Sequence, residues 1–240
     1  MRPQRKQEFA LVTDSFRCHG CPVCNGKGCT DELPGMGGVN KNENFLLNCS
    51  AWKKLYEDEG GAKKIPSLSR EQLMDLIRLA PVTGAEENIG WEEEADFYED
   101  FFMTLHYSGI KLSVGDGTPD TKLVYGLNAI KTIQQERDRE CRAAVFFKPY
   151  PDENLINRIA WATPVANHIG IDIDAYNIVT MRNKVKLEKK TATQIESIMK
   201  KIDVPFVLKG IFTRDDIELV KEAKPDIVYF SNHGGRVETR

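Results

Sequence analysis

The sequence predicts an α/β fold, a (β/α)8 barrel, from three observations. Six short apolar runs recur beyond residue 69, and stretches with helical periodicity separate them. Strands that alternate with helices in this way form parallel sheets. Lys209 and His233 stand at the ends of two successive runs, and a βα barrel presents its chemistry at the carboxyl ends of its strands. The predicted strands are residues 79–83, 110–114, 143–147, 169–174, 205–209 and 226–231.

Helix signals separate these strands. Ser69 with Gln72, and Thr213 with Asp216, have the spacing of an N-terminal capping pair. Residues that recur every three or four positions then mark each helix, and we expect the stripe of the helix that ends near residue 224 to be buried. The stripes are Leu73, Leu76 and Ile77; Phe97, Phe101 and Leu105; Leu123, Leu127, Ile130 and Gln134; Leu155, Ile159, Ala162 and Ala166; Ile195, Ile198, Met199 and Ile202; and Ile217, Val220 and residues 221–223.

The number of strands is too small for a closed barrel. A (β/α)8 barrel needs eight strands, and this sequence offers six. We therefore expect residues 66–240 to form an incomplete barrel of about six βα units, in a chain truncated at its C-terminus. Such a sheet would leave two edges open, which reduces stability and solubility.

Composition narrows the class of protein. The 240 residues carry a formal net charge of −3 and 41% hydrophobic residues, which suits a globular domain with its own core. The charge argues against nucleic acid as a partner, because no basic excess is present to contact phosphates. No apolar run approaches the roughly 20 residues of a membrane helix, and the charged N-terminus does not resemble a secretory signal. We expect a cytoplasmic protein, whose six Cys are thiols or metal ligands.

Residues 1–65 form a separate, Cys-rich N-terminal extension. Cys18, Cys21, Cys24 and Cys29 are close enough for their thiolates to converge on zinc or an iron–sulfur cluster. The alternative is a reduced Cys-rich loop that packs against the barrel. Residues 33–38 (LPGMGG) read as a turn, since neither a strand before them nor a Lys-Ser/Thr pair after them marks a phosphate loop.

The C-terminal strand–helix–strand carries the most specific motif. Lys209 lies in LKGI and His233 lies in SNHGGR, twenty-four residues apart. The two motifs at this spacing resemble those of the FMN-dependent α-hydroxy-acid dehydrogenases and oxidases, such as glycolate oxidase and lactate oxidase. The resemblance covers residues 69–236. It implies FMN as cofactor, a small 2-hydroxy acid as substrate, oxygen or another electron acceptor, and a homo-oligomer in the full-length form.

The resemblance assigns roles to the C-terminal residues. His233 would be the base that starts oxidation of the hydroxy acid, since its pKa near neutrality suits proton removal. Arg236 would bind the substrate carboxylate with its planar fork. Lys209 would stabilise the negative charge that develops on the flavin. Gly234 and Gly235 would let the backbone approach the flavin.

Upstream residues follow from the same resemblance. Tyr150, in FFKPY, would help to hold the substrate, and Asp174 would orient His233. Arg182 is the nearest candidate for a second arginine at the substrate. The remaining flavin contacts would come from Pro81, Val82, Thr83, Gly115, Lys148, Asp172 and Lys209. Three of these depart from the family pattern, because Gly115 replaces a Ser, Lys148 a Gln and Asp172 a Thr.

Two other functions remain open from the sequence. One is a different FMN barrel enzyme, such as a type 2 isopentenyl-diphosphate isomerase; the His-Arg pairing in SNHGGR argues against it, because that pairing suits a carboxylate substrate. The other is a non-catalytic metal- or redox-responsive protein on a decayed flavin barrel, which the Cys cluster and the altered flavin contacts favour. A flavin spectrum would support the enzyme, and a colourless zinc protein or a brown one would support the last.

Overall fold

The computed structural model describes residues 50, 67–85, 91, 93–178, 181, 184–235 and 237. The predicted Cys18, Cys21, Cys24 and Cys29 cluster, the turn at residues 33–38 and most of the N-terminal extension lie outside the described residues. Within the described residues, no helix has the length and apolar character needed to cross a lipid bilayer.

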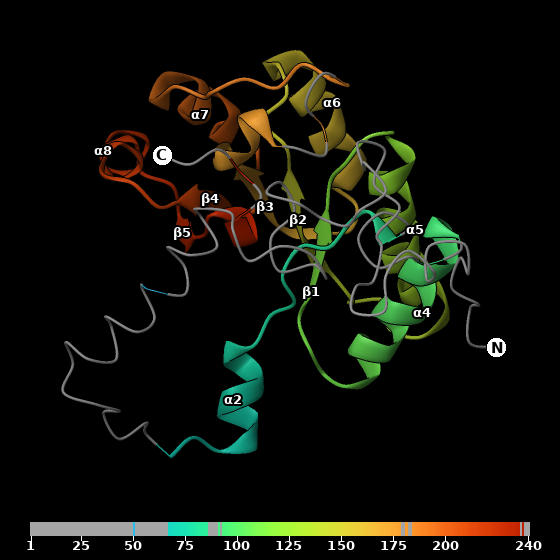
Figure 1. The fold of residues 1–240 in the computed structure, drawn as a ribbon. Coiled ribbons are helices and arrows are strands. Elements are labelled where there is room, and N and C mark those ends of the chain that lie inside the picture. The colour runs from blue at the N-terminus through green and yellow to red at the C-terminus, as the bar shows by residue number, and fades with distance from the viewer. Residues whose placement is uncertain are drawn as a thin grey trace, which may run out of the picture.

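The core of the fold is a five-stranded parallel sheet (Figure 1). Its strands are β1 (Leu112–Gly115), β2 (Ala143–Phe147), β3 (Ala166–Asp172), β4 (Phe206–Ile211) and β5 (Ile227–Phe230), and their order in space is their order in the chain. All four neighbouring pairs are parallel. The predicted parallel α/β class is confirmed, and the sequential order is that of a βα barrel. Closure of the sheet into a barrel stays a prediction.

The first predicted strand, residues 79–83, is present only as a segment that touches β1. Isolated parallel bridges join Arg78 to Lys111 and Val82 to Val114, instead of a continuous ladder. Pro81 between them has no backbone N–H to donate, which explains the interruption. The segment still runs beside β1, because Gly115 N–H donates to the carbonyl of Val82 at 3.1 Å.

The boundaries of β3 correct two predictions. Ala166, expected on the preceding helix, opens β3 and pairs with Ala143 of β2. The helix α6 (Asp152–Ala162) ends before it. At the other end, β3 stops at Asp172, and residues Ile173–Asn177 form the 3₁₀ helix η2. Asp174 therefore lies on a 3₁₀ turn after the strand, so its side chain does not follow the alternation of faces along β3.

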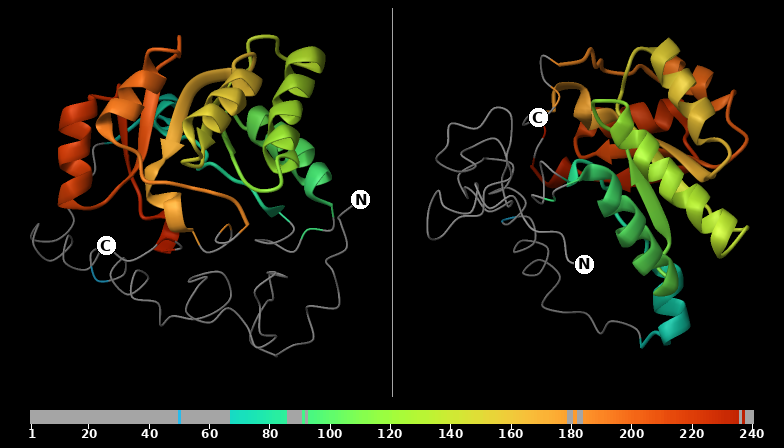
Figure 2. Two further views of the ribbon diagram at one scale, coloured as in Figure 1. Left: turned by 90° about the horizontal axis from the view of Figure 1, so that it is seen from above. Right: turned by 90° about the vertical axis from the view of Figure 1, so that its right-hand side faces the viewer.

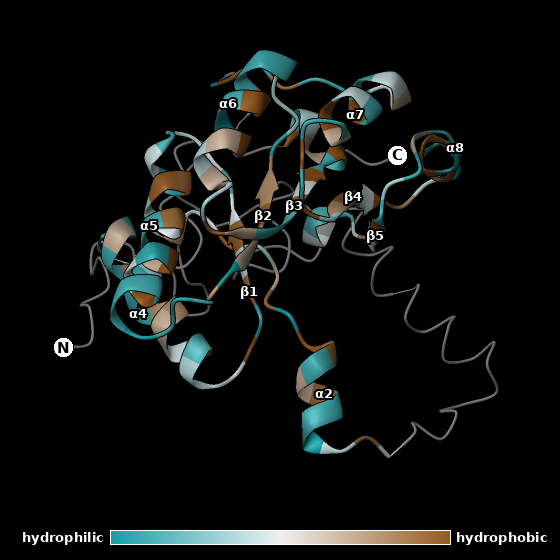
Figure 3. Cartoon of the chain, turned by 180° about the vertical axis from the view of Figure 1, so that it is seen from behind, coloured by the Kyte–Doolittle hydropathy of each residue, from teal (hydrophilic) through white to brown (hydrophobic). Residues whose placement is uncertain are grey.

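Helices surround the strands on one side. α4 (Glu94–Tyr107), α5 (Thr121–Glu136), α6, α7 (Ala192–Met199) and α8 (Arg214–Ala223) form an arc around the sheet in Figure 1. Figure 2 shows the same series in order from α8 in red to α4 in green. Figure 3 shows helices of mixed hydropathy around mainly hydrophobic strands. This arrangement follows from right-handed crossovers between parallel strands, which place successive helices on one face.

Helix α2 (Arg70–Leu76) confirms its predicted cap, and none of its residues is buried. Ser69 Oγ accepts from the N–H of Gln72, and the Gln72 side chain accepts from the N–H of Ser69, as predicted. Leu76, the last residue of α2, is 71% exposed. Figures 1 and 2 show α2 beyond the end of the sheet. The predicted helical stripe is present but lies exposed, because periodicity does not show whether a partner surface lies opposite.

The alternation of side chains along the strands separates two faces of the sheet. Val145 and Phe147 of β2 belong to the large core under the helices, whereas Ala144 and Phe146 pack with Val207 of β4 on the opposite face. Side chains at every second position share a face. Continuing this alternation places Lys148, Asp172 and Lys209 on the face away from the helices, at the carboxyl ends of β2, β3 and β4.

Candidate active site

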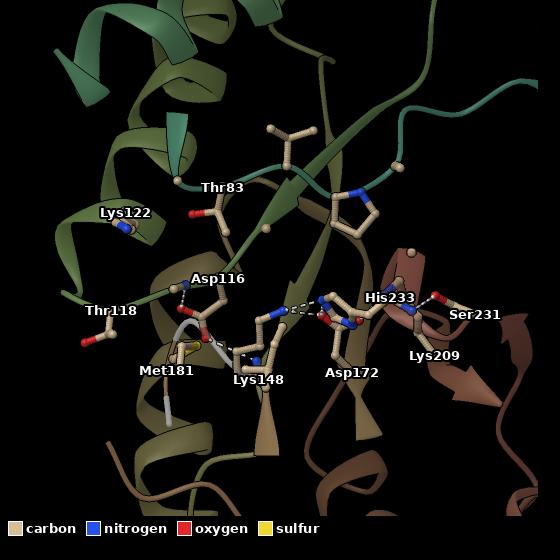
Figure 4. A pocket seen from close by; sticks show the side chains of 18 of the residues that line it. Thr83, Asp116, Thr118, Lys122, Lys148, Asp172, Met181, Lys209, Ser231 and His233 are labelled. Atoms are coloured by element: carbon tan, nitrogen blue, oxygen red, sulfur yellow. Dashed lines mark hydrogen bonds and ion pairs between the residues drawn. The ribbon is translucent and has the colours of Figure 1, made fainter. Parts of the chain in front are cut away.

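A cavity of about 500 Å³ opens at the carboxyl ends of the strands (Figure 4). It has the size of a small-molecule site. Ala80, Pro81, Val82, Thr83, Gly84, Gly115, Asp116, Gly117, Thr118, Lys122, Lys148, Asp172, Ile178, Met181, Lys209, Tyr229, Ser231, His233 and Gly234 line it. The structure thus brings together eight predicted flavin contacts and the predicted base.

An ion triad lies in this cavity. Lys148 Nζ is 2.8 Å from Asp172 Oδ2, and Lys209 Nζ is 2.7 Å from Asp172 Oδ1. Strand register explains the meeting, since Asp172 pairs directly with Lys209 and Phe147 pairs with Ile171 one step earlier. Both ammonium groups hold the pKa of Asp172 well below its usual range, although burial acts in the opposite direction. The carboxylate therefore stays ionised.

Lys209 keeps its charge at the same place. Burial lowers the pKa of Lys209, but Asp172 and Asp174 together raise it above its ordinary value. Its ammonium also lies 5.6 Å from the centre of the Tyr229 ring, within the range of a cation–π contact. The cavity therefore holds a fixed cation whose excess charge is balanced by nearby carboxylates.

His233 lies between a cation and an anion. Its Nε2 is 3.0 Å from Lys148 Nζ, and its Nδ1 is 3.1 Å from Asp174 Oδ1. An ammonium can only donate, so Nε2 must accept from Lys148, and Nδ1 then carries the proton and donates to Asp174. Burial, with the ammonium groups of Lys148 and Lys209, lowers the pKa of His233 to about 4. The near-neutral pKa expected from the sequence is therefore wrong, because the site disfavours the charged ring. His233 is a neutral imidazole at physiological pH.

Glycine and local turns set the position of this histidine. His233 itself has φ of 58° and opens the short 3₁₀ helix η3 (His233–Gly235). Its N–H donates to Ser231 Oγ at 3.0 Å. Behind the ring, Gly210 has φ of 101°, and a Cβ there would lie 2.6 Å from Cγ of Asp174. Only glycine lets β4 approach the carboxylate so closely.

Three ligand-type groups at the cavity and directly behind its wall have the spacing of a metal centre. One ligand atom each from Asp172, Asp174 and His233 lies within 4.8 Å of the others. The two oxygens of Asp172 already contact the ammonium groups of Lys148 and Lys209. The same Lys148 ammonium also contacts Nε2 of His233. A divalent cation would have to displace or oppose these like charges, so the arrangement suits an ion-pair network.

The wall of the cavity opposite the triad is made by residues 80–84. A Cβ on Gly115 would lie 2.8 Å from the carbonyl oxygen of Val82, so a side chain at position 115 is excluded. This accounts for Gly115, where the resemblance predicts a Ser. Buried Glu94 of α4 supports the wall, because its Oε1 accepts from Gly84 N–H at 2.8 Å and from the Tyr98 hydroxyl at 2.9 Å.

Sequence reasoning missed a buried acid that also lines the cavity. Asp116 is fully buried and accepts from Gly117 N–H at 2.7 Å and from Arg158 Nη1 at 2.8 Å. Its Oδ2 also accepts from the backbone N–H of Lys148 at 3.3 Å. Burial raises the pKa of Asp116 to about 6 despite Arg158 and Lys148. Its place in Gly-Asp-Gly directly after a strand was the available signal.

Several predicted residues lie elsewhere. Tyr150 is buried beside the cavity without lining it: its hydroxyl donates to the carbonyl of Gly117 at 3.3 Å, and Arg158 lies 4.2 Å from its ring centre. Asp174 stands behind His233. Gly235 follows in η3. Arg182 and Arg236, the predicted substrate arginines, lie outside the described residues.

Comparison with known proteins agrees with the motifs. Residues 130–239 match the family model described as FMN-dependent dehydrogenase, which confirms the resemblance drawn from LKGI and SNHGGR and implies FMN as the cofactor. No curated protein matches the chain.

Among solved structures the chain is similar to mandelate oxidase. The structure of that enzyme with 3,3-difluoro-2-hydroxy-3-phenylpropionic acid is 19% identical in sequence to this chain, with a TM-score of 0.47. The match covers 68% of this chain and 49% of the enzyme chain. Its structure with benzoyl-formic acid is 18% identical, with coverage of 68% of this chain and 49% of the enzyme chain and a TM-score of 0.45. A further structure of mandelate oxidase is 17% identical, with coverage of 68% of this chain and 50% of the enzyme chain and a TM-score of 0.45. The chain spans about half the length of these structures, and TM-scores below 0.5 assign it neither activity nor substrate.

Proposed function

We propose, from the match of residues 130–239 to the FMN-dependent dehydrogenase family, that this chain takes part in oxidising a small 2-hydroxy acid to a 2-oxo acid with FMN. The observation that carries the proposal is His233, a neutral imidazole at the rim of the strands with Asp174 on its Nδ1. A neutral histidine backed by a carboxylate is the arrangement of a general base.

The residues of the cavity fit the flavin ring. Its volume of about 500 Å³ lies in the range of cofactor sites, and Gly115 leaves the wall at residues 81–83 without an intervening side chain. Lys209 and Lys148 would supply donors and positive charge, and Pro81, Val82 and Thr83 would line the opposite wall. When bound there, FMN would accept the two electrons and the second hydrogen released by the substrate, and the first leaves as a proton to the base.

The protein's own groups would handle the proton and the carboxylate. His233 would take a proton from the 2-hydroxy acid at Nε2, and Asp174 would stabilise the imidazolium that results. Arg236, with Tyr150 and Arg182 as further candidates, would bind the substrate carboxylate. Oxygen or another acceptor would then take the electrons. Zinc or an iron–sulfur cluster at Cys18, Cys21, Cys24 and Cys29, and a homo-oligomer in the cytoplasm, remain separate proposals.

Flavin binding tests the proposal directly. We expect the purified chain to acquire the visible absorption of bound flavin when titrated with FMN. Lys209→Met should weaken binding, whereas Lys221→Met, which removes an exposed cation on α8, should not. If the chain retains no flavin absorption after free FMN has been removed by gel filtration, or if it carries only zinc, the proposal is contradicted.

Flavin reduction tests the role of His233. Under anaerobic conditions glycolate, lactate or mandelate should bleach the bound flavin. His233→Asn should keep the flavin spectrum and slow bleaching by about 100-fold or more, the usual contribution of a general base. Bleaching at an unchanged rate would show that His233 is not the base.

A further inference from the structure

Lys148 makes contacts that flavin binding alone would not require. Its ammonium is 2.8 Å from Asp172 Oδ2 and 3.0 Å from His233 Nε2 (Figure 4). The side chains of Lys148 and Asp172 are only 7% and 3% exposed. Two short contacts hold this buried ammonium in one place. If the ammonium moved away from Asp172, it would leave a buried charge without its partner, which costs free energy.

The contact with His233 fixes which ring nitrogen is protonated. The ammonium has no lone pair, so a hydrogen bond at 3.0 Å requires Nε2 to accept. A ring protonated at Nε2 would instead direct an N–H at an ammonium. Asp174, at 3.1 Å on the other side, requires a proton on Nδ1. Both neighbours therefore select the same tautomer.

We propose that Lys148, anchored by Asp172, is a positioning residue for His233: its ammonium holds the imidazole neutral and protonated at Nδ1, and it covers the Nε2 lone pair. The inference rests on the proposed function, because it deepens the role of His233 as base. For Nε2 to accept a substrate proton, its hydrogen bond with Lys148 must break first.

The charges that face the ring support this assignment. Lys148 follows β2, Asp172 ends β3, Asp174 lies on η2 and Lys209 lies on β4, so two cations and two anions from four elements surround His233. With a neutral ring these charges sum to zero. A proton on the ring would leave a net positive charge in a buried site, and burial with the two lysines accordingly lowers the pKa of His233.

Nitrogen NMR of the ¹⁵N-histidine-labelled full chain, without added flavin, tests the proposal. The sequence has four histidines, and the signals missing in His233→Gln identify His233. In the wild type we expect the Nδ1–H tautomer at pH 7 and a pKa well below that of free histidine. An Nε2–H tautomer in the wild type would overturn the proposal, whatever the variants do.

Two variants separate the charge of Lys148 from its hydrogen bond. Lys148→Met removes both, so the His233 pKa should rise by about 1 to 3 units and the tautomer preference should weaken. Lys148→Gln removes the charge but keeps an N–H donor, so the pKa should rise while the Nδ1–H tautomer persists. Lys221→Met is the matched control on exposed α8 and should leave both unchanged.

Folding and flavin binding are controlled separately. Circular dichroism and thermal unfolding show which variants fold, and Lys148→Gln carries the test if Lys148→Met does not. An unchanged His233 pKa in a folded Lys148 variant would overturn the proposal. Because no flavin is added, a chain that fails to bind FMN would contradict the proposed oxidation and leave this result standing.

Discussion

His233 adopts a left-handed backbone conformation, with φ of 58°, and Gly234 follows with φ of 65°. A non-glycine residue rarely takes this conformation, which costs about 1 kcal/mol or more. The hydrogen bond from His233 N–H to Ser231 Oγ and the Asp174 contact offset that cost. The chain thereby directs the imidazole between Asp174, the contact expected from the family resemblance, and Lys148, a contact that the sequence did not indicate.

The close approach of Gly210 to Asp174 predicts a specific mutational effect. Gly210→Ala should cost about 1 to 2 kcal/mol for the left-handed backbone, and an additional amount of about 1 to 3 kcal/mol for the clash with the Asp174 carboxylate. Gly109→Ala is the matched control, since φ there is 75° but the nearest atom to a Cβ is 3.7 Å away. Urea unfolding measures both. Equal losses of stability would show that Gly210 does not hold Asp174 in place.

The pKa of His233 predicts how stability changes with pH. The folded protein protonates His233 at about 4, whereas an unfolded histidine protonates near 6.5. Between these values the unfolded chain binds more protons, so this contribution to stability is complete above pH 6.5 and is lost as pH falls towards 4. At about 1.36 kcal/mol per pKa unit it amounts to about 3 kcal/mol. The stability difference between wild type and His233→Gln should shrink by this amount from pH 7 to 4 in urea unfolding.

Asp116 provides a test of opposite sign. Its pKa is raised to about 6 from 3.8, so its contribution is present below pH 3.8 and is lost as pH rises through 6. The difference between wild type and Asp116→Asn should therefore shrink as pH rises from 4 to 6.5. If both variants changed in the same direction, the assignment of one of the two pKa shifts would be wrong.

Two helices show how the same local signal has different consequences. Ser69 on α2 and Thr213 on α8 both form complete capping boxes. α8 packs against β4 and buries Asp216 and Ala223, whereas α2 buries nothing. The buried stripe predicted for α8 was wrong at Ile217, which is 45% exposed, because α8 makes its contacts mainly through its sides facing α7 and β4. A cap sets where a helix begins, but contact with the sheet decides whether that helix contributes to the stability of the whole fold.

This difference predicts unequal effects of removing the two caps. Thr213→Ala should lower the free energy of global unfolding by about 1 kcal/mol, the usual value of an N-cap. Ser69→Ala should fray α2 alone and leave global unfolding unchanged. Chemical denaturation followed by tryptophan fluorescence compares the two variants. A larger loss in Ser69→Ala would mean that α2 packs on the fold after all.

The sheet as a whole ends in an apolar edge within the described residues. β5 is the outermost strand, and Ile227, Tyr229 and Phe230 are 39%, 36% and 73% exposed. An exposed edge strand with large apolar side chains tends to pair with other chains. The edge lies directly beside β4, the strand that carries Lys209, so contacts made there adjoin the candidate active site.

We therefore expect self-association through this edge. Phe230→Glu should shift the chain towards the monomer in light-scattering measurements at increasing concentration. Tyr107→Glu is the control, because Tyr107 is 66% exposed at the end of α4, away from β5. Association that persists unchanged in Phe230→Glu would place the contact elsewhere.

The sequence by itself determined the parallel α/β class, the five strands of the sheet with the helices between them, two capping boxes and the resemblance to the FMN-dependent dehydrogenases. Apolar runs, periodicity and the spacing of Lys209 and His233 are local features, so they can be read without coordinates. The tertiary structure decided the rest, because it depends on which strands lie side by side. Strand register brings Lys148, Asp172 and Lys209 into one ion triad, although they are far apart in the chain. Side-chain charge alone did not indicate that triad, nor that His233 would lie against its Lys148.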